Sequence, residues 1–461
     1  MNEKMLTTLQ ELRKFALNKG ITAEFFFHEE DSALMRFANS AISLNTNEHL
    51  LRLEITAYED QKRASFSMIT NLDAVEDMKQ GVLQAAEIVK HAQPLSYQPT
   101  IPVYQETIIE DFAFDPDLAG ISNSEKLDYF NQAVDGLESD QIKLGGIYSS
   151  GKNVIAMMNT QSEHAQAFTT SDAQITMVLS HKTLKWEVID EQSAQKKADL
   201  DPAPLHRQLS YLLGHYQNDP AEQVPLGEYD IVFGPAATAE LVNTMNWIGF
   251  NGGMMKRGYS FLTEEHLGQQ VLGETFTLVD DPSRRETFPF SRDMMGVRRE
   301  PFTLFDKGVF RAFTWNQDDA DEYGAQPTGH DVMHKSLVVG AGDEPINTLE
   351  ELVNAPREKD VLYIPFIHYM NFVNPSKGLI TGSSRFGALL LKQDGSVVVP
   401  YNVRLTQSLL DIFGEKVAWM SDGQVAYNTS SSYGARNPTA LVVPNFVYVK
   451  DLAISHANSS Y

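Results

Sequence analysis

Strand-like runs dominate the first 70 residues of the chain, and a helix pattern stands on either side of them. The three or four runs are Ala23–His28, Ala33–Leu44, Leu50–Tyr58 and Arg63–Ile69. Apolar and polar side chains alternate most cleanly in the third run, as in a strand with one buried face. Apolar residues at helical spacing extend from Met5 to Ala16 and over Asp73–His91. This order predicts an α+β domain with an antiparallel sheet.

The rest of the chain divides at two points. Prolines 94, 99, 102 and 116 mark an extended connector over residues 93–116. A second boundary is expected near Asp201–Pro225, after which most segments have strand character. We therefore predict an N-terminal α+β domain over residues 1–200 and a strand-rich C-terminal α+β domain over residues 221–461.

Composition and charge restrict the classes of protein that fit. Of the 461 residues, 42% are hydrophobic and 21% are charged, the profile of an ordinary soluble globular protein. The formal net charge of −24 repels phosphate backbones, so we expect no direct binding of nucleic acid. The chain has no cysteine, which excludes disulfides, thiolate nucleophiles and thiolate metal sites. Any metal would need histidine, aspartate or glutamate ligands.

The N-terminal segment does not have the pattern of a secretory signal. Its apolar residues are spaced rather than continuous, and charged residues such as Glu3, Lys4 and Glu11 interrupt them. No run in the chain approaches the ~18 consecutive apolar residues of a membrane span. These features predict a cytoplasmic protein with no membrane partner.

The sequence motifs of several common enzyme classes are missing. We find no Gly-x4-Gly-Lys-Ser/Thr phosphate loop, no dinucleotide fingerprint, no Gly-x-Ser-x-Gly nucleophile elbow and no His-Glu-x-x-His zinc helix. The chain therefore offers none of these chemistries through its standard motif.

One metal-like spacing remains, at His330 and His334. On a helix, two histidines four apart share a face and could hold one zinc, with His368 or Asp331 as a third ligand. In a strand they would also share a face but lie too far apart for one ion. The strand-like segment that follows favours the second interpretation, and the His-based metal site stays an alternative.

Aromatic residues gather around a glycine-rich stretch in the middle of the chain. Candidates for a peptide groove are Trp247, Phe250, Asn251, Gly252 and Gly253. The two glycines suit a tight turn with positive φ, and a glycine-rich edge could admit a peptide as an added strand. The competing interpretation places the aromatic residues in the core, where such residues occur more often.

A pair of carboxylates, Asp280 and Asp281, follows a predicted strand and precedes Pro282. Paired carboxylates could bind a cation or act as acid and base. An Asp-Pro turn is the simpler interpretation, and we favour it.

Several segments, in order, resemble the TldD/PmbA family of two-subunit metallopeptidases. Met35–Ile42 is similar to the family's Arg-Phe-Ala-Asn strand, and Val232–Pro235 to the strand that precedes its metal helix. Further similar segments are Tyr259–Phe261, Leu278–Pro282, Phe305–His330, Asn374–Gly378 and Val399–Pro400. Together they span most of the chain, and their order is more specific than any one of them.

The resemblance implies two α+β domains and a dimer. In the family, one type of subunit carries His-Glu-x-x-x-His after the Gly-Pro strand, and a late cysteine, to hold a catalytic metal. Here the ligand positions fall near Asn243, Thr244 and Ile248, and an amide, a hydroxyl and an alkyl group cannot hold zinc in that arrangement. The chain therefore resembles the PmbA (TldE) type of subunit, with no catalytic residue or cofactor of its own and with zinc expected in a partner subunit.

Three hypotheses on function remain open. In the first, the chain is the non-catalytic subunit of a heterodimer with a TldD-like, zinc-bearing subunit that acts on unfolded peptides or small proteins. In the second, it is a homodimeric peptide-binding module without activity. In the third, it is a hydrolase with a relocated metal at His330, His334 and His368. The family is associated with maturing ribosomal peptides, degrading an antitoxin and modulating DNA gyrase, and the sequence does not choose among these.

Overall fold

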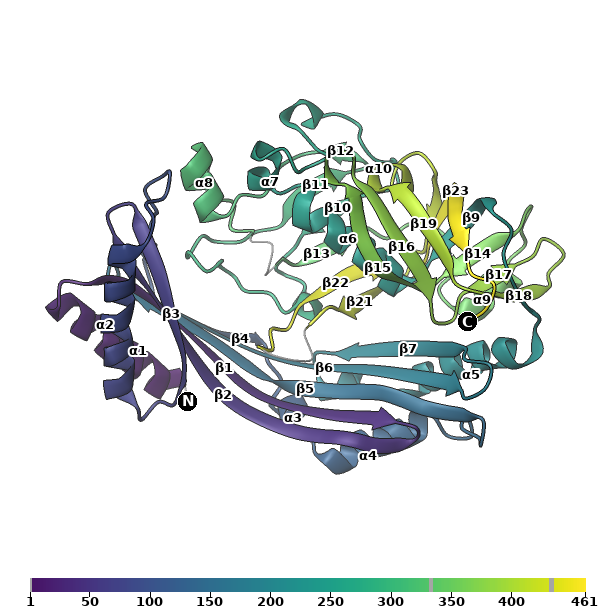
Figure 1. Ribbon diagram of the computed structural model, residues 1–461, viewed down its shortest axis with the longest axis horizontal. Coiled ribbons are helices and arrows are strands. Elements are labelled where there is room, and N and C mark those ends of the chain that lie inside the picture. The colour runs from purple at the N-terminus through teal and green to yellow at the C-terminus, as the bar shows by residue number, and fades with distance from the viewer. Residues whose placement is uncertain (1, 331–334, 431–434) are drawn as a thin grey trace.

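The computed structural model describes residues 2–330, 335–430 and 435–461. Helices and three largely antiparallel sheets give the α+β architecture that the sequence predicts. Long strands curve beneath a strand-rich C-terminal half, as Figure 1 shows. Every strand of the first sheet precedes residue 200, and every strand of the other two follows residue 220. The domain boundaries themselves, 1–200 and 221–461, stay predictions.

In the part of the chain that the structure describes, the first sheet has seven strands. In sheet order they are β3 (Lys62–Thr70), β2 (Ala41–Glu59), β1 (Thr22–Ala38), β5 (Ile142–Asn159), β6 (Ala165–His181) and β4 (Ile108–Ala113), with β7 (Glu187–Ala194) also paired to β6. Strand β1 does not stop at His28, where the sequence predicted a break, but continues to a hairpin turn at Asn39 and Ser40. The charged residues in the predicted break are tolerated because they are paired: Arg52 donates to buried Glu30 at 2.8 Å.

Two predicted helices cover one end of this sheet (Figure 1). Helix α1 (Asn2–Asn18) and helix α2 (Val75–His91) pack on its apolar face. Met78 and Val82 of α2 share a core cluster with Phe25 and Ile55 of the strands. The apolar side chains on one face of each helix and on one face of β2 thus pack together in one core, as the sequence pattern indicates.

The C-terminal half contains the other two sheets. The six-stranded sheet has the order β12 (Val309–Phe310), β11 (Phe302–Asp306), β10 (Leu278–Asp280), β13 (Leu337–Val339), β22 (Ala440–Pro444) and β21 (Gln424–Asn428). The ten-stranded sheet has the order β15 (Phe366–Asn374), β16 (Leu379–Arg385), β19 (Val403–Ser408), β23 (Val447–Ala457), β9 (Gly227–Phe233), β14 (Val361–Ile364), β17 (Leu389–Leu391), β18 (Val397–Pro400) and β8 (Ala221–Glu222), with β20 (Val417–Met420) paired to β23.

Four runs of this half each read as a single strand in the sequence, but each contains parts of two strands. The runs are Val361–Ile367, Leu379–Lys392, Val397–Leu405 and Leu441–Val449. Pro365 separates β14 from β15 because proline has no N–H to donate to a sheet. Phe386 and Gly387, with φ of 55° and 81°, separate β16 from β17. Residues 401–402 separate β18 from β19, and residues 445–446 separate β22 from β23. The strand regions were predicted correctly, but the corners between them were not.

The remaining α-helices lie in both halves. They are α3 (Pro116–Ala119), α4 (Asn123–Ala133), α5 (Pro202–Asn218), α6 (Pro235–Ile248), α7 (Gly252–Lys256), α8 (Gln317–Tyr323), α9 (Leu349–Asn354) and α10 (Leu409–Ile412). Helix α5 links the two halves along the chain. One hydrophobic cluster contains Ile175 from the first sheet, Leu209 from α5 and Leu389 from the ten-stranded sheet. The two halves therefore share a core and do not meet only at a polar surface.

Candidate functional site

Helix α6 is central to the candidate site. It follows β9, an inner strand of the ten-stranded sheet, and begins with Pro235 at its first turn, where a missing N–H costs nothing. Most of its side chains are buried, including Leu241, Val242 and Met245. Gly234-Pro235 and the apolar run after it predict a helix that continues to about Ile248. The structure confirms this helix, which ends before Gly249.

One face of α6 is open and borders a cavity of about 550 Å³. Asn243, Thr244 and Trp247 of α6 line this cavity. Other parts of its wall are formed by Met370, Asn371 and Phe372 of β15, and by Ala435, Asn437 and residues 439–441. The rings of Trp247 and Phe372 lie 6.2 Å apart between centroids, and Trp247 is 57% exposed. We call this cavity the α6 pocket.

The three positions implied as metal ligands do not point the same way. Asn243 and Thr244 line the α6 pocket, whereas Ile248 is buried in the core at 4% exposure. Residues five apart on a helix are turned by about 140° from each other, and residues four apart by only about 40°. Trp247, four residues after Asn243, therefore shares the pocket with it, whereas Ile248, five residues after Asn243, does not.

The side chains of the α6 pocket do not fit a zinc ion. Of the lining residues that the structure describes, Glu240 is the one carboxylate, and the others carry amides, hydroxyls, apolar groups and the Lys335 ammonium. Partial burial raises the pKa of Glu240. Lys335 donates to Thr314 at 3.0 Å and lies 4.7 Å from the Phe250 ring centroid. Among the described residues, no group of three or more histidine, cysteine, aspartate or glutamate side chains could hold a metal.

The glycine-rich candidates for a peptide groove lie in packed structure. Phe250 is fully buried, and Asn251 caps α7 by accepting from Met254 N at 3.0 Å. A Cβ on Gly252 would come within 2.3 Å of the Trp315 ring, and one on Gly253 within 2.1 Å of the Asp319 carboxylate carbon. The positive φ predicted for the two glycines is wrong, because both belong to α7. Close packing, not turn geometry, requires glycine here.

The histidines of the alternative metal site have other roles where they are described. His330 is buried, and its Nδ1 lies 2.7 Å from Asp280 Oδ2. His368 lies against Phe386, with ring centroids 5.0 Å apart, and burial together with Arg385 lowers its pKa. His334 and Asp331 lie outside the described residues.

Asp280 is a buried ionic centre and not part of a surface turn. Its Oδ1 accepts from Arg299 at 2.8 Å and from the backbone of Ser336 at 2.7 Å. Burial alone would raise its pKa, but the hydrogen bond with His330 and the charge of Arg299 outweigh burial and lower it. Asp281 does form the predicted turn, because its Oδ1 accepts from Ser283 N at 2.9 Å.

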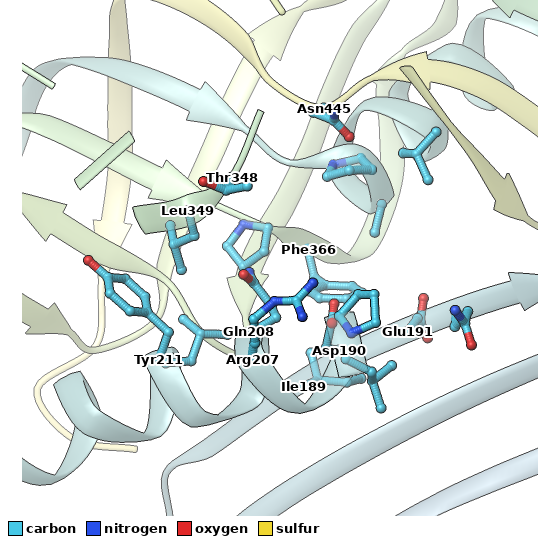
Figure 2. A pocket seen from close by; sticks show the side chains of 18 of the residues that line it. Ile189, Asp190, Glu191, Arg207, Gln208, Tyr211, Thr348, Leu349, Phe366 and Asn445 are labelled. Atoms are coloured by element: carbon cyan, nitrogen blue, oxygen red, sulfur yellow. The ribbon is translucent and has the colours of Figure 1, made fainter. Parts of the chain in front are cut away.

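A larger cavity, of about 1140 Å³, lies between the two halves of the protein. Figure 2 shows side chains from β7, α5 and α9 around it, among them Asp190, Arg207 and Tyr211. Pro235 and Ala236 at the start of α6 also line it, so α6 contributes to both cavities. We call it the interdomain cavity.

Two adjacent acids of β7 line the interdomain cavity. Burial raises the pKa of Asp190 to about 8. Burial also raises the pKa of Glu191. Hydrogen bonds from hydroxyl groups act in the opposite direction but are weaker than burial; one of them comes from Thr176, which donates to Glu191 at 2.8 Å. Neither residue was predicted from the sequence. An acidic pair in a strand carries no motif, and its desolvation depends on packing against α5 and against β21, which is more than 200 residues away in the chain.

A loop of the α6 pocket is anchored in the first sheet. Arg436 lies between Ala435 and Asn437, which line the pocket, and its Nε donates to buried Asp172 at 2.8 Å. It also donates to Ser149, and its backbone carbonyl lies 2.8 Å from His28 Nε2. Contacts between residues so distant in sequence leave no local pattern, and sequence analysis missed them.

Comparisons with known proteins agree on one family. A family model described as the PmbA/TldA metallopeptidase C-terminal domain matches residues 226–456. A protein of Methanothermobacter thermautotrophicus named metalloprotease is 29% identical over 126 residues, and the match covers 27% of this chain and only 26% of that protein.

Solved structures match over the whole length. TldE of Thermococcus kodakarensis has a TM-score of 0.80 at 16% identity, covering 98% of this chain and 100% of that one. A candidate modulator of DNA gyrase from Bacteroides thetaiotaomicron has a TM-score of 0.78 at 15% identity, covering 99% and 98%. Another from Thermotoga maritima has a TM-score of 0.73 at 16% identity, covering 97% and 99%. At such identities these matches establish the fold. None of the described helices is long and apolar enough to cross a membrane.

Proposed function

The chain belongs to the PmbA/TldD metallopeptidase family, and from this we propose that it is a non-catalytic subunit that helps to bind peptide for a zinc-bearing partner. The observation that carries the proposal is the open face of α6. At the place where the family's metal helix follows the Gly-Pro strand, that face presents an amide, a hydroxyl and an indole. None of these groups can bind zinc or polarise its water as the family's histidines and glutamate do.

The α6 pocket is suited to an extended peptide. Strand β15 lies at one edge of the ten-stranded sheet, and its residues 370–372 line the pocket opposite α6. An edge strand can pair with an added peptide strand through backbone groups, which accepts many sequences. Trp247 and Phe372 supply apolar contact for side chains of such a peptide.

The experiment is a mild affinity purification from the native cell, followed by metal and peptidase assays. We expect near-equal amounts of a family relative that carries His-Glu-x-x-x-His. We also expect zinc only in that relative, and hydrolysis of an unstructured peptide by the pair but not by this chain alone. If the chain copurifies only with itself, the homodimeric binding module replaces the proposal. If the isolated chain holds one zinc and hydrolyses the peptide, a relocated metal site replaces it.

A further inference from the structure

A third cavity, of about 300 Å³, lies between the first sheet and helix α4. Strand β1 lines it with Asp31 and Ser32, and β5 with Ser150 and Gly151. The segment that leads into α4, residues 119–123, closes another side, and Lys126 of α4 completes the lining. We call it the Lys126 cavity. The α6 pocket and the interdomain cavity share none of these residues.

Lys126 is an unusual residue to find in such a place. It is only 1% exposed, and lysine is almost never this buried without a partner. Side chains on a helix lean toward its N-terminus, so Lys126, in the second turn of α4, leans toward residues 119–123. Its Nζ lies 5.8 Å from the Tyr148 ring centroid, a cation–π contact, and no hydrogen bond or ion pair joins it to the described residues.

Three acidic residues of α4 and of the first sheet already have partners. Glu125 accepts from Lys197 at 2.6 Å and from Ser122 at 2.7 Å. Glu30 accepts from Arg52, and Asp172 from Arg436. Burial and the charge of Arg436 lower the pKa of Lys126 to about 8, as expected for an ammonium group without a counterion.

The cavity lining contains one cation and one anion, Lys126 and Asp31, and the two differ in how deeply they are buried. Lys126 is buried, whereas the Asp31 side chain is 59% exposed, at the mouth of the cavity. Hydroxyls and amides of the lining, from Ser150, Asn47 and Asn123, lie in the same cavity. A volume of about 300 Å³ is at the lower limit for ligand sites, and it suits a molecule the size of an amino acid.

We propose that the Lys126 cavity binds a free α-amino acid, with its carboxylate on the Lys126 ammonium and its ammonium group toward Asp31. The ligand supplies the counterion that the buried lysine lacks, and burial strengthens this ion pair relative to one in water. The exposed Asp31 carboxylate at the mouth would attract the ammonium group of a zwitterion and repel a simple anion, so the cavity should prefer the zwitterion. This site goes beyond the proposed peptide-binding role and does not depend on it.

The test is calorimetric titration of the full chain with L-alanine, acetate and inorganic phosphate. We expect L-alanine to bind at least tenfold more tightly than acetate. Lys126→Gln abolishes L-alanine binding, and the matched control Lys14→Gln, at an exposed lysine, leaves it unchanged. Asp31→Asn, at the exposed rim where folding is not at risk, weakens L-alanine binding to the level of acetate.

A measurement on the unsubstituted protein keeps the test decisive if Lys126→Gln fails to fold. In protein labelled with ¹⁵N-lysine, the Lys126 ammonium resonance is identified by its absence from Lys126→Arg. Saturating L-alanine is expected to raise the pKa of this group. The proposal is overturned if L-alanine leaves that pKa unchanged, if Asp31→Asn leaves L-alanine binding unchanged, or if phosphate binds more tightly than L-alanine.

Discussion

Arg436 and Asp172 form a buried ion pair across 264 positions of the chain, with the guanidinium Nε 2.8 Å from the carboxylate. The arginine belongs to a loop of the C-terminal half, and the aspartate to β6 of the first sheet. Because the neighbours of Arg436 line the α6 pocket, the wall of that pocket is held in place by the other half of the protein.

Asp172→Ala is expected to lower the free energy of unfolding by about 3–5 kcal/mol, because it leaves the Arg436 charge buried and unpaired. Adding Arg436→Met should restore most of this loss. Denaturant unfolding of both variants provides the measurement. Asp73→Ala is the control: its ion pair with Lys4 is exposed, and its loss should leave the free energy within experimental error. Equal effects of Asp172→Ala and Asp73→Ala would contradict the prediction.

Stability should depend on pH through Asp190. Its pKa of about 8 in the folded protein lies above the ~3.9 of an unfolded chain, so the folded state binds more protons between these values. The free energy of unfolding therefore falls as pH rises from about 5 to 8, by at most ~1.4 kcal/mol per pH unit for one group. Thermal and urea unfolding should show this decline reduced in Asp190→Asn. The exposed control Asp77→Asn should retain it, and an identical decline in Asp190→Asn would rule out this assignment.

Grafting the family's ligands onto α6 should fail at Ile248. In Asn243→His/Thr244→Glu/Ile248→His, the last imidazole replaces a side chain buried in the core, at an expected cost of about 2–5 kcal/mol. Asn243→His/Trp247→His instead places two imidazoles on the pocket face. Zinc retained after dialysis, measured by mass spectrometry, should be higher for the second variant. Stoichiometric zinc in the triple variant would show that α6 can turn Ile248 toward the pocket.

Trp247→Ala should weaken peptide hydrolysis by the proposed pair without unfolding this chain. The indole is 57% exposed in the α6 pocket, so its loss removes peptide contact more than core packing. We expect KM to rise about tenfold with kcat nearly unchanged, as when binding is lost equally in ground and transition states. Tyr259→Ala is the control, since Tyr259 is 56% exposed and does not line the pocket. A loss of kcat alone would argue against a binding role.

Hydrophobic periodicity predicted helices and strands correctly where the apolar residues of the pattern are the residues that become buried. The alternation in β2, the apolar stripes of α1 and α2, and Gly234-Pro235 before α6 each report contacts made within one element or with its neighbours. The prediction failed where charged residues lie within a strand. The charged residues Glu29 to Asp31 indicated a break between two strands. In the structure, however, Arg52 of β2 pairs with Glu30 and Lys152 of β5 pairs with Glu29.

The sequence by itself determined the α+β class and the family, because residue types at ordered spacings suffice for these. Only the tertiary structure decided which side chains share a cavity. It turned Ile248 into the core and Trp247 into the α6 pocket, joined Arg436 to Asp172, and placed Lys126 and Asp31 in the lining of one cavity. Burial and long-range pairing depend on segments far apart in the chain, and no local pattern records them.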